Sequence, residues 1–178
     1  MISNGEHKHT HFFLIIILLV LISGVVSYKF IRAKHAWNAY SLQAQTVILN
    51  QPSLSSSEQA LVIATTISTI PAKTPMYKTP TQLKEYVAVL SRQMHRDLVV
   101  IDVNKMILAD TVSANIGTKY QGDTANEVTY TITDKQIRTF KETSVDYPDG
   151  VSEVSVPITD SSGQSIGSVI LSATHISN

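Results

Sequence analysis

The sequence contains no cysteine, and several classes of function are excluded with it. Among its 178 residues there is no thiol, so disulfides, thiolate catalysis, cysteine zinc sites and covalently attached c-type haem are ruled out. Charge of one sign is also lacking, because 14 lysines and arginines balance 14 aspartates and glutamates. Nucleic-acid-binding proteins normally carry a basic excess or a basic face, so nucleic acid is not an expected partner.

Motifs that identify common enzymes are missing too. The sequence has no glycine-rich phosphate loop and no Gly-x-Ser-x-Gly nucleophile elbow. The carboxylates are few and scattered along the chain, so no pair of them stands out as an acid and a base. We therefore expect a protein that is not an enzyme.

The histidines are candidates for metal or haem ligation, and each has a simpler explanation. Three of them alternate in the polar tail of residues 1–11, where nothing nearby in sequence completes a metal shell. His95, with Met94 or Met106 as a second ligand, is a candidate for binding b-type haem. A histidine at the end of a helix is favoured by the helix dipole alone. We expect no metal and no cofactor.

One long hydrophobic run is present. Residues 12–28 form a stretch of 17 residues without a charged side chain, which is about the minimum for a transmembrane helix. Tyr28 at its end suits a membrane interface. We predict an uncleaved single-span anchor. A cleaved signal peptide is the alternative, although Val25-Val26-Ser27 is a poor small-residue cleavage site.

The charges around this run bear on its orientation. Lys29, Arg32 and Lys34 follow it, whereas Lys8 and Glu6 precede it. The positive-inside rule would then place the C-terminal part of the chain in the cytoplasm. The imbalance is small, and the N-terminal amine and histidines reduce it further.

An apolar stripe continues directly from the predicted span. Its spacings alternate between three and four residues, as in a helix that packs along its length on a partner. The stripe comprises Phe30, Ala33, Trp37, Tyr40, Ala44 and Val47. It is either the seam of a homodimer or a contact with the chain's own domain, and Pro52 ends the helix.

Two further helices are predicted before the first strand. Ser55 and Glu58 have the spacing of a capping box, and the helix they begin ends by Pro71. Thr79-Pro80 is a second start signal, with proline at the first helical position. The buried face of this helix is predicted at Leu83, Val87, Leu90 and Met94.

Strands are predicted from Leu98 onward. Residues 98–101 are a continuous apolar run, typical of a central strand covered on both faces. Asn104-Lys105 makes a turn, and residues 106–110 return as the next strand. Between Ile116 and Arg138 two readings remain open. Gly122-Asp123-Thr124 is a helix start, whereas Val128, Tyr130 and Ile132 alternate as in a strand.

The C-terminal part predicts an antiparallel meander. Residues 138–146 read as extended, and Pro148-Asp149-Gly150 turns the chain into residues 151–158. In that segment apolar residues alternate with polar ones, which predicts a strand with one buried face. A turn over residues 160–163 leads into a strand over residues 166–172, where Gly167 permits close approach of another backbone.

These segments, in this order, resemble the Cache (PAS-like, extracytoplasmic) sensor domains of bacterial and archaeal receptors. The resemblance covers about half of the chain. It is carried by residues 97–110, 115–117 and 156–158, by Asp160 and Gly163, and by Ile166-Gly167.

The resemblance implies a fold class and a location. The fold would be α+β, a mostly antiparallel five-stranded PAS-like sheet with flanking helices. We expect a polar tail over residues 1–11, a span over 12–28, a helical membrane-proximal region over 29–96 and the sheet domain over 97–178. The resemblance places this domain outside the cytoplasm, periplasmic or extracellular, and we follow it over the charge count. The Arg-x-Trp-Tyr motif of amino-acid-binding members is absent, so no particular ligand is implied.

The function expected is a membrane-anchored small-ligand sensor in signal transduction. No second span or signalling domain follows the last predicted strand, so we expect it to act through a homodimer or a membrane protein partner. The alternative is an accessory or assembly subunit of a membrane complex, with the PAS-like domain as a docking surface. The candidate ligand-binding residues are polar groups at positions that line the pocket of this fold: Tyr120, Tyr130, Tyr147, Asp110 and Arg138.

Overall fold

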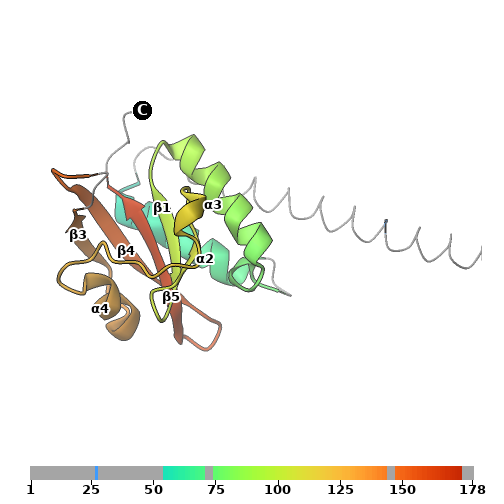
Figure 1. Ribbon diagram of the computed structural model, residues 1–178. Helices are drawn as coiled ribbons and strands as arrows, with labels where there is room; N and C mark the ends of the chain where they lie inside the picture. Colours follow the sequence, from blue (N-terminus) through green and yellow to red (C-terminus); the bar gives the residue numbers. More distant parts are fainter. Residues whose placement is uncertain (1–26, 28–53, 71–73, 144–146, 174–178) are drawn as a thin grey trace, which may run out of the picture. The chain divides into compact units, whose positions relative to one another are not determined.

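A five-stranded antiparallel sheet is the centre of the structure (Figure 1). Every pair of neighbouring strands is antiparallel, and the strand order is β2-β1-β5-β4-β3. The strands are β1 (Leu98–Asp102), β2 (Ile107–Ala109), β3 (Arg138–Glu142), β4 (Val151–Thr159) and β5 (Ser165–Ser172). The predicted α+β class and the antiparallel meander of the last three strands are confirmed.

The computed structural model describes residue 27 and residues 54–70, 74–143 and 147–173. The chain divides into two units, residues 1–39 and 40–178, and the elements below all belong to the second. The predicted span and the apolar stripe lie outside the described residues, apart from Ser27. Within the described ranges, none of the helices has the length and apolar character that a membrane crossing requires.

Helix α2 (Ser56–Thr69) begins with the predicted capping box. The Glu58 amide donates to the Ser55 hydroxyl at 3.3 Å, and the Ser55 amide donates to the Glu58 carboxylate at 2.8 Å. These two bonds satisfy backbone donors that the first helical turn otherwise leaves open. The helix buries Ala60, Ile63 and Ile67 at helical spacing.

Helix α3 (Pro80–Met94) has proline at its first position, and it ends where His95 adopts a left-handed conformation with φ of 51°. A short 3-10 turn, η1 (Met76–Lys78), connects it to α2. The predicted buried face of α3 is confirmed at Leu83, Val87, Leu90 and Met94.

Helices cover both faces of the sheet. Helix α2 packs on β4 and β5, and α3 packs on β1 and β2 beside it, whereas α4 (Glu127–Asp134) also packs on β4 and β5 and so occupies the opposite face (Figure 1). The face under α2 and α3 is apolar. It presents Leu98, Val100, Val154, Val156, Val169 and Leu171, which stand opposite one another in the strand register.

Strand β4 corrects one prediction from the sequence. The alternation along residues 151–158 predicted one buried and one solvated face, but Glu153 and Ser155 are 3% and 0% exposed. They lie on the face opposite to Val154 and Val156, and α4 covers that face. The polar half of the alternation is therefore buried, because β4 is an inner strand between two helical layers.

The segment between Ile116 and Arg138, for which the sequence favoured neither helix nor strand, contains helix α4. The prediction of a strand at Val128, Tyr130 and Ile132 is wrong. A helix is present, as the alternative predicted, but it begins at Glu127 and not at residues 122–124. Val128, Thr131 and Ile132 are buried on the helix face that packs on the sheet, whereas Tyr130 points outward and is 54% exposed. A spacing of three and four residues fits burial here better than a spacing of two.

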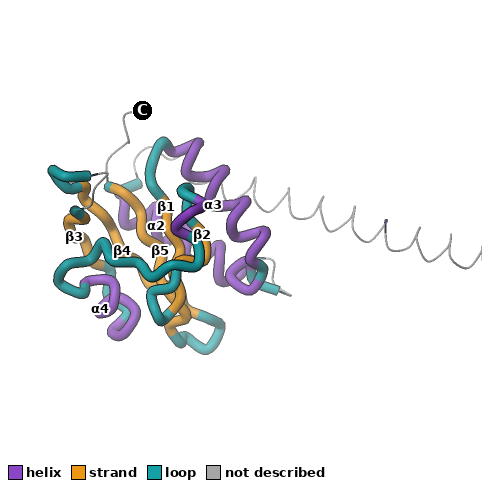
Figure 2. Tube along the Cα trace, in the orientation of Figure 1, coloured by secondary structure: helices purple, strands orange, loops and turns teal. Residues whose placement is uncertain are grey.

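The long connection between β2 and α4 lies on the same side of the sheet as α4. It includes the 3-10 turn η2 (Ser113–Asn115) and passes in front of the strands before it reaches α4 (Figure 2). Tyr120 from this loop joins an apolar cluster with residues of the sheet and of α4. The cluster comprises Ile101, Ile107, Tyr120, Val128, Ile132, Phe140 and Ile170.

Candidate functional site

A strip of buried polar side chains runs along the α4 face of β4 and β5. Glu153 and Ser155 lie on β4, and Ser168 and Ser172 lie on β5; all four face α4 according to the register and are buried. The hydroxyls of Ser155 and Ser168 are 2.8 Å apart, and Ser168 also donates to the Val156 carbonyl at 2.9 Å. Buried polar groups normally have partners, and these serines do.

Glu153 is the exception in this strip. Its Oε2 atom is buried and has no hydrogen-bond partner. Burial, followed by the negative charges of Glu142, Asp97 and Asp110, raises the pKa of its carboxyl to about 9, while Arg96 opposes the increase. Glu153 is therefore a neutral acid at neutral pH, held in a negatively charged environment. We refer to Glu153, Glu142, Asp97 and Asp110 as the acidic cluster.

Tyr120 connects the apolar cluster to the acidic cluster. Its hydroxyl donates to Glu142 Oε2 at 2.7 Å, and burial together with the charge of Glu142 raises its pKa above the usual range. Gly122 makes room for this contact. A methyl group at position 122 would lie 2.4 Å from the Tyr120 hydroxyl and 2.5 Å from Glu142 Oε2.

Tyr147 and Asp110 lie in the same neighbourhood. The Tyr147 hydroxyl donates to Asp97, and the pKa of Tyr147 is raised by burial, by this hydrogen bond and by the charges of Asp97 and Glu142. Asp110 accepts from the Val112 amide at 2.8 Å and from the Asn115 side chain at 3.0 Å. Asp110 thus holds the start of the loop between β2 and α4 in place, and its charge raises the pKa of Glu153.

The structure separates the other two candidates from this neighbourhood. Arg138 forms a bidentate ion pair with Asp134, with nitrogen–oxygen distances of 2.7 and 2.5 Å. The guanidinium carbon lies 5.7 Å from the centre of the exposed Tyr130 ring. Of the five residues proposed from the sequence, Tyr120, Tyr147 and Asp110 lie around Glu153, whereas Tyr130 and Arg138 form an outer contact between α4 and β3.

Two of the candidate haem ligands, His95 and Met94, lie at the end of α3, and the third, Met106, directly precedes β2. His95 is exposed and closes the helix, while Met94 is buried on the helix face that contributes to the core. Adjacent residues on opposite sides of a helix end do not point into one ligand site. This arrangement agrees with the helix-end interpretation of His95.

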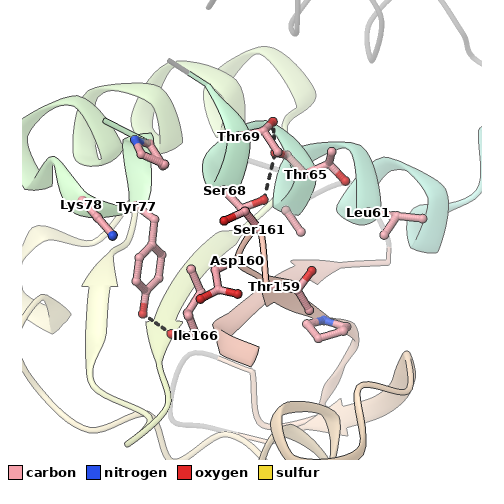
Figure 3. A pocket seen from close by; sticks show the side chains of 13 residues that line it. Leu61, Thr65, Ser68, Thr69, Tyr77, Lys78, Thr159, Asp160, Ser161 and Ile166 are labelled. Atoms are coloured by element: carbon pink, nitrogen blue, oxygen red, sulfur yellow. Dashed lines mark hydrogen bonds between the residues drawn. The ribbon is translucent and has the colours of Figure 1, made fainter. Parts of the chain in front are cut away.

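A surface groove of about 530 Å³ lies on the other side of the sheet, between α2, η1 and the β4–β5 hairpin (Figure 3). Several of its polar groups bind to other parts of the chain. Tyr77 donates to the Ile166 carbonyl, Ser68 donates to the Thr65 carbonyl at 3.1 Å, and Asp160 accepts from Ser162 and Gln164 in the hairpin turn. These three side chains therefore hold the groove's own elements together.

Sequence reasoning missed the central residues of the acidic cluster. Glu153 was assigned to a solvated strand face, and Glu142 and Asp97 were not singled out. The position of β4 between two neighbouring strands was predicted from the sequence, but the helix that covers its second face was not, and this helix buries Glu153.

Comparison with known proteins identifies the fold. No protein-family model matches the sequence, and no curated protein is significantly similar to it. Among solved structures, the E. coli DcuS sensor domain has a TM-score of 0.50 and 16% identity, covering 73% of this chain and 90% of that chain. At this identity the likeness is one of fold alone, and the predicted antiparallel sheet with flanking helices resembles the fold of that sensor domain.

Two other solved structures are similar over parts of longer chains. An extracellular ligand-binding receptor from Desulfohalobium retbaense has a TM-score of 0.46 and 14% identity, covering 79% of this chain and 24% of that chain. The V. cholerae histidine kinase DctB sensor domain has a TM-score of 0.43 and 13% identity, covering 79% and 54% respectively.

Proposed function

We propose that this chain is an extracytoplasmic sensor module that binds a small ligand on the α4 face of its sheet. The observation that carries the proposal is the Oε2 atom of Glu153, which is buried without a partner in a strip of polar side chains. A buried polar atom without a partner is destabilising. A bound ligand that supplies the missing partner explains why the protein keeps such a group.

The fold supports a sensing role over an enzymatic one. The E. coli DcuS chain with the same fold is a sensor domain. In the described part of the chain, the strongly perturbed acid stands beside tyrosines and other carboxylates, and no nucleophile–base pair accompanies it. This arrangement suits recognition of a ligand.

Anchoring and signalling form the second half of the proposal. Residues 12–28 hold the chain in the membrane, with residues 29–178 outside the cytoplasm, and the stripe from Phe30 to Val47 pairs two copies. Ligand binding biases a two-state equilibrium of the helix that leads to the membrane. A partner protein in the membrane receives the signal.

The N-terminus of the purified protein tests the anchor. If residues 12–28 are uncleaved, the purified native protein begins near Met1 and requires detergent; a soluble form beginning at Tyr28 would contradict the anchor.

A thermal-shift screen of the full chain in detergent tests ligand binding. The panel contains small carboxylates, amines, amino acids and purines. A ligand at one hundred times its Kd raises the free energy of unfolding by about 2.7 kcal/mol, which shifts the melting temperature by several degrees. We expect at least one class to give such a shift.

The same screen separates sensor from docking subunit. If no compound shifts the melting temperature and the protein co-purifies stably with a membrane complex, we conclude that the chain is an accessory subunit of that complex and not a sensor. In that case the groove beside α2 is the concave surface of the described residues to mutate first. A shift that is lost on changing Glu153 supports the sensor.

A further inference from the structure

The charge around Glu153 identifies the class of ligand. The acidic cluster joins carboxylates from four places in the chain: β4, the end of β3, the residue before β1 and the residue after β2. The charges of Glu142, Asp97 and Asp110 raise the pKa of Glu153, and the charge of Arg96 lowers it. A ligand that enters this environment meets an excess of negative charge.

Three basic side chains of the described residues bind groups outside the acidic cluster. Lys105 pairs with Asp123, and Arg138 pairs with Asp134. Arg96 donates to the Ser172 carbonyl, to Gln59 at 2.5 Å and to Ser56 at 2.7 Å. Over the described residues, neither of the two ion pairs involves a member of the acidic cluster.

A second atom on this side of the sheet also lacks a partner. Thr131 of α4 is fully buried on the helix face that packs on the sheet, and its Oγ1 atom has no hydrogen-bond partner. Thr131 and Glu153 belong to different elements that pack against each other. Two orphaned oxygen atoms on facing elements are what a ligand with N–H donors would satisfy.

The surroundings favour an organic cation over a metal ion. In the described segments, no three histidine, aspartate or glutamate side chains are grouped so as to hold a metal ion. Phe140 stands opposite Glu153 in the β3–β4 register, and Tyr120 lies in the same apolar cluster as Phe140. Aromatic rings next to a carboxylate are suited to an ammonium group, through its charge and its C–H or N–H surface.

We propose that the ligand of this module is a small amine, whose ammonium group is held by Glu153 and Glu142 against the rings of Phe140 and Tyr120. The proposal rests on the sensor function proposed above and adds the sign of the ligand's charge. An anionic ligand is disfavoured, because it would be repelled by the carboxylates of the acidic cluster, and Arg96 already donates to three other groups. Binding takes a proton from Glu153, because a neutral acid must ionise to pair with an ammonium group.

A set of compounds matched in size tests the charge directly. The probes are butylamine, 1,4-diaminobutane, butanoate and butanedioate, applied to the full chain in detergent at pH 7.5. We expect the two amines to raise the melting temperature and the two acids to leave it unchanged. Calorimetric titration in two buffers that differ in ionisation enthalpy should show release of close to one proton per amine bound.

Two variants locate the effect. Glu153→Gln should weaken amine binding at least tenfold and abolish the proton release. Asp134→Asn, which removes an exposed carboxylate already paired with Arg138, should leave both unchanged. If Glu153→Gln does not fold, Glu142→Gln takes its place, with an expected loss of at least threefold.

The outcomes separate this inference from the sensor function. If the acids bind and the amines do not, the module is a sensor but its ligand is not a cation. If amines bind equally well to the Glu153→Gln or Glu142→Gln variant, the acidic cluster is not their site. If neither this set nor the broad panel binds, the sensor function itself fails.

Discussion

Gly167 of β5 lies against Ile101 of β1 so closely that a methyl group at position 167 would come within 2.1 Å of the Ile101 carbonyl oxygen. The same methyl group would lie 3.2 Å from the Tyr77 hydroxyl, which donates to the Ile166 carbonyl. The contact joins the two inner strands β1 and β5 at the end of their ladder. Only glycine fits there without moving one backbone away from the other.

Gly167→Ala should therefore destabilise the domain strongly. We expect a loss of about 2–4 kcal/mol in the free energy of unfolding, because the contact atom belongs to the backbone and cannot rotate away. Urea unfolding of the full chain measures it. Gly163→Ala is the matched control: its φ of 78° strains alanine, but no atom lies within 4 Å of the added methyl group, so a loss of about 1 kcal/mol is expected. Equal losses at both positions would refute the packing argument.

The pKa of Glu153 predicts how stability depends on pH. The unfolded chain releases this proton near its ordinary value of 4.5, whereas the folded protein keeps it up to about pH 9. The stabilising contribution of protonated Glu153 to the free energy of unfolding is therefore fully present below pH 4.5. It is lost as the pH rises from 4.5 to about 9, and it changes no further above pH 9. Glu153→Gln removes the dependence.

Glu153→Gln should accordingly be more stable than the wild type at pH 8 and nearly equal to it at pH 4.5. We expect a difference of about 2–4 kcal/mol at pH 8, from urea unfolding of both proteins without ligand. Comparing the two proteins at each pH cancels the titration of every other group. A difference that does not change between pH 4.5 and pH 8 would show that Glu153 is already ionised in the fold.

Much of the fold was predictable because its signals are local. The capping box at Ser55, the proline that begins α3 and the turn at Asp160 each fix the backbone through bonds within a few residues. The apolar run of β1 also identified an inner strand without knowledge of its neighbours. These features depend on short-range geometry, so the sequence alone specifies them.

The site was less predictable because it depends on contacts between distant segments. Tyr130 and Tyr120 are equally plausible ligand residues in sequence, but the helical turn of α4 points Tyr130 outward while the loop places Tyr120 against Glu142. Glu153 has the alternation of a solvated position, and only the packing of α4 on β4 buries it. The neighbours that shift its pKa come from three other segments.

Association is predicted from the apolar stripe of residues 30–47, which lies outside the described residues. Trp37→Glu combined with Tyr40→Glu places two charges on the stripe, which a paired helix cannot bury without a large desolvation penalty. If the stripe is a dimer seam, we expect monomers in detergent by light scattering. The opposite result, an unchanged mass with a lower melting temperature, would show that the stripe packs on its own domain.

Arg96 ties α2 to the end of the sheet, and its replacement tests that link. Its buried guanidinium donates to the Ser172 carbonyl, to Gln59 and to Ser56. Arg96→Met keeps most of the side-chain volume but leaves these acceptors without their donor. We expect a loss of about 2–4 kcal/mol in urea unfolding, since a buried charge-assisted network is broken.

Arg96→Lys distinguishes geometry from charge in the same network. Lysine keeps the positive charge, but its single ammonium group cannot reach a strand carbonyl and two helix side chains with the planar fork of arginine. We expect it to recover less than half of the stability that Arg96→Met loses. Full recovery by lysine would mean that the charge near Glu153, and not the bridge between α2 and β5, is what the protein requires at this position.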